Sequence, residues 1–226
     1  RCARILLVHT GHLGDTLMAL AAMRRSRTKL PNAHITAVVV PPADALVRRC
    51  GCFDQVLSLP ELSGARRTPK RVMRWLLGMG RIMQLRPHMA VAYMPDPVDG
   101  MLAALSGAPL RVGVVKEYNW VYERAWFTLA LRRGALGPHR TGRYHAVSSA
   151  AGFIQRHDPP LEDLQLVSED EQILEAHGAT LERRFGVLLL CGSSAKKRWP
   201  LERFGMLAQR LVRDADVPLV MVTGPD

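Results

Sequence analysis

The sequence has no apolar run approaching the roughly 20 residues that an α-helix needs to cross a bilayer. It is also poor in aromatic residues, which make up 6% of its 226 residues. Only four cysteines occur, and the C-x-C at Cys50 and Cys52 has no second pair to complete a zinc site. We therefore expect free thiols in a reducing compartment and no metal site.

Several sequence signatures of common function classes are also missing. No G-x-G-x-x-G follows a strand, which argues against a dinucleotide-dependent dehydrogenase, and no Walker A loop occurs. No helix-turn-helix or RNA-recognition signature is found, and aromatic residues are too sparse for stacking platforms. We therefore do not expect nucleic acid as the main partner.

The net charge of +11 is unevenly distributed. Residues 1–155 carry 22 Lys and Arg against 8 Asp and Glu, residues 156–185 carry 3 against 8, and residues 186–226 carry 6 against 4. The basic excess therefore belongs to the first two thirds of the chain. Such a surface attracts polyanions, that is nucleic acid, anionic lipid or a phosphorylated glycan.

The hydrophobic periodicity alternates between short apolar runs and amphipathic segments. Strands are expected at 4–8, 34–40, 53–59, 89–94 and 110–114, and helices at 15–29, 43–49, 69–85, 98–105, 120–132 and 143–155. This alternation predicts an α/β protein with a doubly wound parallel sheet.

The same pattern restarts near the end of the chain, with a strand at 185–190, a helix at 201–213 and a strand at 217–222. We expect residues 1–155 to form one Rossmann-like domain and residues 169–226 to begin a second. Residues 156–168 are rich in Pro, Asp and Glu, and this composition predicts a linker between the two domains. Because the chain lacks an initiator Met and stops just after a strand, we expect a fragment with a truncated second domain.

The loop at residues 9–16 follows the first strand, where open α/β sheets bind ligands. Its glycines allow tight turns and close approach of a substrate. Asp15 then stands at a helix start, where it acts either as an N-cap or as a carboxylate that takes a proton from a hydroxyl group. His9 and His12 flank the glycines and could touch the same substrate.

A second loop, at residues 191–200, follows the first strand of the second unit. It contains Ser193 and Ser194, then three cations that include Lys197, then Pro200 at a helix start. Backbone N–H groups at a helix start and a lysine suit a phosphate, which makes these residues candidates for phosphate binding. The alternative is an ordinary solvated basic loop.

A third segment, residues 65–88, holds seven Lys and Arg and no acid. It is either an amphipathic helix with a basic outer face or a surface that docks an anionic membrane or an anionic glycan headgroup. In the second case, Trp75 and its neighbours could lie at the membrane. A further basic cluster could extend this surface, at Arg132, Arg133, Arg140 and Arg143 with His139.

Five segments in order resemble the ADP-heptose:lipopolysaccharide heptosyltransferases of glycosyltransferase family 9. They are residues 5–8, 14–17, 31–36, 106–113 and 197–204. The resemblance implies the two-domain GT-B fold, with acceptor binding in the first domain and sugar-nucleotide binding in the second. It implies an inverting, metal-free enzyme without a cofactor, in which heptose moves from ADP-heptose to a lipopolysaccharide core acceptor.

The resemblance also assigns roles to residues. Asp15 matches the catalytic base, and Lys197 matches the lysine that contacts the donor phosphates. Ser193 and Ser194 match small or hydroxyl residues that approach the same phosphates. The expected acceptor contacts are Gly14, His12, Arg66, Arg67 and Lys70. The expected location is cytoplasmic, on the inner face of the inner membrane, because the acceptor is acidic and membrane-anchored.

The chain departs from the family pattern in three places. His9 stands where the family often has Arg, Ala21 where it often has Pro, and the downstream D-x-G…H donor segment is missing. We therefore expect weak donor binding by this chain alone. Two alternatives remain: a transferase of the same fold that uses another sugar nucleotide for a surface polysaccharide, and a non-catalytic module that binds anionic membrane or nucleic acid.

Overall fold

The computed structural model describes residues 2–61, 68–116, 124–154, 172–173, 175–177, 185–190, 198–215 and 217–223. The chain divides into two compact units, Arg1–Glu162 and Asp163–Asp226. The division falls inside the segment 156–168, which lies outside the described residues, so the extent of the linker stays a prediction. Among the helices that the described residues form, none combines the length and the apolar composition that a membrane span requires.

The first unit is built on a parallel sheet of order β3-β2-β1-β4-β5-β6. The strands are β1 (Arg4–His9), β2 (His34–Val39), β3 (Gln55–Ser58), β4 (Met89–Ala92), β5 (Leu110–Val115) and β6 (Leu129–Arg132). The helices are α1 (Leu13–Lys29), α2 (Ala43–Arg49), α3 (Pro69–Leu85), α4 (Pro97–Leu105) and α6 (Arg140–Ala150), with 3₁₀ turns η3 (Arg124–Trp126) and η4 (Arg133–Leu136). The predicted doubly wound α/β unit is confirmed.

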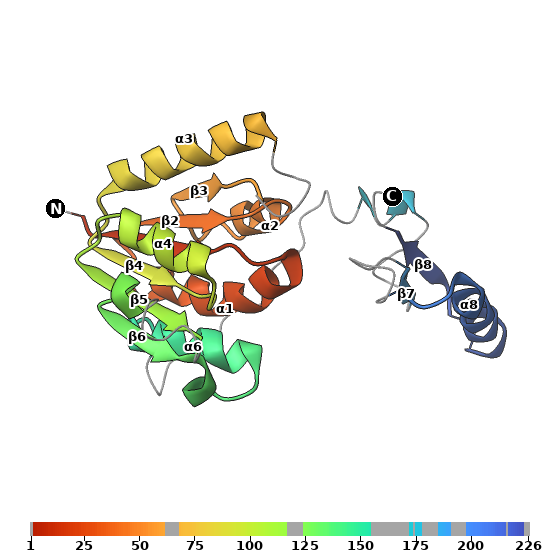
Figure 1. Cartoon of the computed structure of the whole chain (residues 1–226). Helices are drawn as coiled ribbons and strands as arrows, with labels where there is room; N and C mark the ends of the chain where they lie inside the picture. Colours follow the sequence, from red (N-terminus) through yellow and green to blue (C-terminus); the bar gives the residue numbers. More distant parts are fainter. Residues whose placement is uncertain are drawn as a thin grey trace. The chain divides into compact units, whose positions relative to one another are not determined.

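Two hydrophobic cores lie on opposite faces of this sheet because successive side chains of a strand point to opposite sides. In β1, Leu7 packs with α1, α2 and α6, whereas Leu6 and Val8 pack with α3 and α4. Figure 1 shows these two helical layers on either side of the sheet. Both faces are covered, which explains why the strands read as continuous apolar runs.

The prediction of a helix over residues 120–132 is wrong for the residues that the structure describes, 124–132. Residues 124–126 form η3, and Leu129–Arg132 form the edge strand β6, paired in parallel with β5. The Thr128 N–H donates to the carbonyl of Arg111 at 2.8 Å, and the Arg111 N–H donates to the Thr128 hydroxyl at 2.8 Å. Leucine, alanine and arginine favour helices locally, but pairing with an existing sheet overrides that preference.

The second unit is described by a parallel pair, β7 (Gly186–Leu189) and β8 (Leu219–Val222), and by the helix α8 (Leu201–Ala215) between them in sequence. This strand–helix–strand unit agrees with the expected start of a second Rossmann-like domain. The polar loop between β7 and α8 lies largely outside the described residues.

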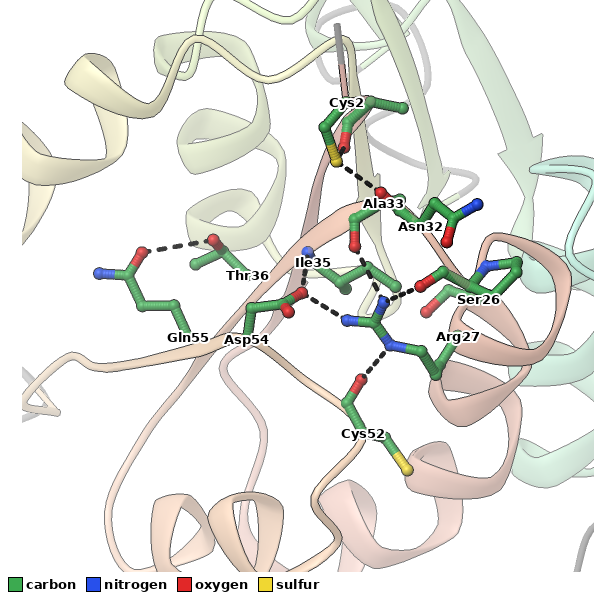
Figure 2. A network of polar contacts seen from close by, with 12 residues as sticks. Cys2, Ser26, Arg27, Asn32, Ala33, Ile35, Thr36, Cys52, Asp54 and Gln55 are labelled. Atoms are coloured by element: carbon green, nitrogen blue, oxygen red, sulfur yellow. Dashed lines mark hydrogen bonds and ion pairs between the residues drawn. The ribbon is translucent and has the colours of Figure 1, made fainter.

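The last turn of α1 is fixed to the starts of β2 and β3 by Arg27 (Figure 2). Its guanidinium donates to the carbonyls of Ala33 at 2.9 Å and Cys52 at 3.1 Å and pairs with the Asp54 carboxylate. Asp54 also accepts the Ile35 N–H at 2.7 Å. Partial burial alone would raise the pKa of Asp54, but the bonds from Ile35 and Arg27 lower it below its ordinary value.

We expect Asp54→Asn to lower the free energy of unfolding at neutral pH by about 1 kcal/mol, because the charged bond to Arg27 is lost and solvent screens it only in part. A lowered pKa means that this contribution is present at neutral pH and disappears as the pH falls through the lowered value, below 3.8. Thermal unfolding of both proteins against pH measures the difference. Asp44→Asn, outside this network, is the control, and a difference that persists unchanged at low pH would contradict this role.

Candidate active site

The loops after β1 and β4 meet at the centre of the sheet's carboxyl edge. The strands β2 and β3 follow one another on one side of β1, and the chain then crosses to the other side of β1, where β4 lies. Such a reversal opens a crevice between the two loops, and ligands of open α/β sheets bind there. The predicted loop at residues 9–16 therefore lies where a ligand site is expected.

A buried carboxylate, Asp99 in α4, ties these two loops together. It accepts the Thr10 N–H at 3.1 Å and the Thr10 hydroxyl on one oxygen, and the Met94 N–H at 3.3 Å on the other. Burial raises the pKa of Asp99 to about 7, although the bonds from Thr10 and Met94 oppose this rise. Asp99 was not among the residues predicted from the sequence; an acid within the apolar stretch 97–105 was the available signal.

Asp15 lies in the first turn of α1 and not at its N-cap, which is His12. The N-cap interpretation of Asp15 is therefore wrong, although an acid in the first turn still suits the helix dipole. Its side chain is 13% exposed and pairs with Arg140 from the start of α6, through Oδ1. The carboxylate therefore faces the crevice with one oxygen engaged.

The position of Arg140 depends on how α6 is held against the rest of the unit. The Ser148 hydroxyl, buried in α6, donates to the carbonyl of Ala22 in α1 at 2.8 Å. The Tyr93 hydroxyl, at the end of β4, lies 2.8 Å from the Ser148 oxygen and can donate to it. Because α1, β4 and α6 are joined in this way, Arg140 and Asp15 come from elements with a fixed relative position.

His9 forms the floor beneath the loop and is fully buried. Its Nδ1 lies 3.1 Å from the Thr16 hydroxyl, which itself donates to the carbonyl of His12 at 3.1 Å, so His9 is placed to donate. Burial lowers the pKa of His9 to about 4, and the ring is therefore neutral at physiological pH. His9 positions the loop from below, whereas His12 is exposed on it.

Gly11 is the glycine that this loop requires. A Cβ atom there would lie 2.7 Å from His9 Cε1 and 3.2 Å from Asp15 Cβ. A Cβ atom at Gly14 would meet nothing within 4 Å. The close packing of the loop over His9 therefore depends on Gly11, although the sequence pattern drew attention to Gly14.

A pocket of about 490 Å³ opens in front of Asp15. Three carboxylates, Asp15, Glu61 and Asp96, line it together with the indole of Trp75. Carboxylates accept hydrogen bonds from hydroxyl groups, and a flat aromatic ring packs against a sugar ring. Trp75 thus lines the pocket, and the expectation that it and its neighbours lie at a membrane surface stays a prediction.

A smaller pocket of about 160 Å³ adjoins the first, and the two share Met94 and Asp96. Its lining is strongly basic and contains Lys116, Arg133, Arg140 and Arg143 beside Tyr144. Burial, together with nearby Arg133, lowers the pKa of Arg143. Such a cluster suits a phosphate or carboxylate group. It brings three arginines of the predicted cluster together with Lys116, which was not predicted as a site residue.

The remaining predicted site residues fall into two groups. Lys70 is exposed at the start of α3 and does not line either of these pockets. The others lie outside the described residues, and their roles stay predictions: Arg66, Arg67, Ser193, Ser194 and Lys197. Within the described ranges, no three His, Cys, Asp or Glu side chains are grouped to hold a metal ion.

No family model and no curated protein sequence matches the chain. Several solved structures, in contrast, are similar to it. A glycosyl transferase family 9 protein from Veillonella parvula has a TM-score of 0.71 and 19% identity, over 99% of this chain and 63% of the other. ADP-heptose lps heptosyltransferase II from E. coli has a TM-score of 0.69 and 18% identity, over 96% of this chain and 63% of the other. E. coli heptosyltransferase WaaC with ADP-2-deoxy-2-fluoro heptose has a TM-score of 0.70 and 14% identity, over 98% of this chain and 69% of the other.

These likenesses concern the fold, because the identities are low. The chain spans 63% of the length of the first two structures. Nearly all of this chain is covered in each comparison, including the start of the second unit. The chain therefore has the GT-B fold of the glycosyltransferase family 9 structures, as the sequence resemblance implied.

We expect Gly11→Ala to destabilise the protein by about 1–3 kcal/mol, because its methyl group would collide with the buried His9 ring. Gly14→Ala is the matched control, and within a helix it should be neutral or stabilising by up to about 1 kcal/mol. Denaturant and thermal unfolding measure both. Equal effects of the two substitutions would contradict the packing role of Gly11.

Proposed function

We propose that this chain is the acceptor-binding half, and the beginning of the donor-binding half, of an inverting heptosyltransferase. The enzyme would move heptose from ADP-heptose to a lipopolysaccharide core acceptor in the cytoplasm, at the inner face of the inner membrane. One observation carries the proposal: a carboxylate, Asp15, stands at the mouth of a 490 Å³ pocket at the switch point of a sheet with this fold.

The pocket in front of Asp15 has the size and lining that a saccharide acceptor needs. A volume of about 490 Å³ lies within the usual range for small-molecule sites. Asp96 and Glu61 can accept hydroxyl hydrogens, and Trp75 offers an apolar face to a sugar ring. Trp75 lies within α3 and Asp96 is the N-cap residue of α4, so regular elements position both, which favours a preformed site.

Asp15 is placed to act as general base in this pocket. Arg140 engages Oδ1, which leaves Oδ2 for the acceptor hydroxyl. As that hydroxyl oxygen attacks the anomeric carbon of the donor, its proton passes to Asp15 and the bond from the anomeric carbon to the diphosphate breaks. Attack opposite the leaving group inverts the anomeric centre. ADP departs with its charge stabilised by Lys197, whose role rests on the resemblance.

The basic pocket next to Asp15 gives the acceptor site a preference for acidic glycans. Lys116, Arg133 and Arg143 would bind an anionic group of the acceptor while the neighbouring sugar occupies the larger pocket. The two pockets share Met94 and Asp96, so one molecule can reach both. A core saccharide with carboxylate or phosphate groups fits this arrangement.

The donor assignment rests on the fold neighbours, two of which are heptosyltransferases by name and one of which holds an ADP-heptose analogue. A transferase of the same fold with another sugar nucleotide is the second candidate. A panel of ADP-, UDP- and GDP-sugars offered with the same acceptor separates the two. Product formation with a non-heptose donor alone would support the second candidate.

We expect Asp15→Asn, in the protein expressed from its complete gene, to lower kcat by a factor of about 10² to 10⁴ because the proton acceptor is lost. The KM for the donor should change little. Release of ADP from ADP-heptose in the presence of acceptor is the measurement, and Asp44→Asn is the matched control. Near-normal turnover of Asp15→Asn with an intact fold would refute this assignment.

We expect Arg133→Ala to raise the KM for an acidic acceptor roughly tenfold and to leave kcat nearly unchanged, because it removes a charged contact made equally before and during the reaction. An acceptor without the anionic group should lose this sensitivity. Arg210→Ala, on the exposed side of α8, removes the same charge elsewhere and serves as control. A change in kcat alone would contradict a binding role for Arg133.

A further inference from the structure

Helix α3 presents an apolar face to solvent even though its inner face is already packed on the sheet. Ile82 is fully buried in the core, and Met73, nine residues earlier, lies about two and a half turns away and therefore on the opposite side. The outward side chains are large, apolar and 38–60% exposed: Val72, Met73, Leu76, Leu77 and Met83. A continuous apolar stripe of this kind on a surface marks an interaction site.

One edge of this stripe is basic. Lys70, Arg74 and Arg81 are four and seven residues apart, so they follow one another along one side of the helix. No acidic residue occurs anywhere in α3. A second copy of the helix would bring like charges together, whereas an anionic surface would neutralise them.

The basic edge also borders a hollow. Arg74 and Arg81 line a groove of about 370 Å³ that is also lined by Arg48 from α2. Arg48 donates to the carbonyl of Val56 at 2.9 Å, which holds its guanidinium in place. Three guanidinium groups around one hollow suit a phosphate group.

We propose that α3 docks the protein on an anionic phospholipid bilayer. The apolar stripe enters the boundary between headgroups and acyl chains, while Arg74, Arg81 and Arg48 bind lipid phosphates at its edge. A helix with an apolar face beside a row of cations is the arrangement that interfacial helices use. Trp75, which α3 itself carries, packs with the same core cluster as Leu59, and both side chains line the pocket of Asp15, so docking of α3 would hold that pocket near the bilayer.

This surface acts without catalysis, and its test therefore needs no active enzyme. Sedimentation with vesicles of phosphatidylcholine containing phosphatidylglycerol, against pure phosphatidylcholine, measures binding of the complete protein. We expect strong binding only to the anionic vesicles, weakened by added salt. Absence of binding, or equal binding to both vesicles, would overturn the proposal.

Matched variants test the apolar stripe. Leu76 in α3 and Leu17 in α1 are both 51% exposed, and α1 lies on the other face of the sheet. We expect Leu76→Glu to lower the partition coefficient about tenfold or more and Leu17→Glu to leave it nearly unchanged, since only the first removes a leucine that enters the bilayer. Equal losses would overturn the proposal.

A second pair tests the basic edge. Arg81→Glu should lower partitioning at least about fivefold, whereas Arg210→Glu, with the same change in net charge, should have a smaller effect. Circular dichroism checks that each variant folds, which glutamate on an exposed helical face should permit. If Leu76→Glu converts a dimer to a monomer and leaves vesicle binding intact, the stripe binds a second copy and the bilayer proposal is wrong.

Discussion

The site depends first on the buried carboxylate of Asp99. It receives hydrogen bonds from Thr10, after β1, and from Met94, after β4, and so closes the floor of the crevice between two loops that the sheet topology opens. Burial raises the pKa of Asp99, and the three hydrogen bonds that its carboxylate accepts from Thr10 and Met94 lower it in part. Tyr144 of α6 adds a second link between the same two strand ends, because its ring packs edge-on against His9 and its hydroxyl donates to the Met94 sulfur at 3.4 Å.

The groups around this link are ordered in layers. His9 and Thr16 support the loop from below, Gly11 allows it to pass close above the ring, and Asp15 stands at its end facing Arg140. Arg140 in turn owes its position to Ser148, which joins α6 to α1 and β4. A single carboxylate at the rim is thus held by buried contacts from three elements, which is the kind of support that a positioned catalytic group needs.

The distribution of charge now has a structural explanation. The excess of cations in the first unit separates into a basic pocket beside Asp15 and a basic edge on α3, and these surfaces are formed by different elements. The first suits an anionic group on a glycan, and the second suits lipid phosphates. An acceptor that is both acidic and anchored in a bilayer would engage the two surfaces together, which links the proposed function to the proposed docking surface.

The sequence by itself determined most of the succession of strands and helices, the parallel sheet and the position of Asp15 after the first strand, because these follow from local periodicity and from glycine and proline signals. It could not identify β6, since its residues favour a helix until β5 offers a partner. Nor could it show that Asp99, Lys116 and Arg140 converge on one crevice, or that Gly11 rather than Gly14 is the glycine required for packing. Such facts depend on contacts between residues far apart in the chain, which only the tertiary structure creates.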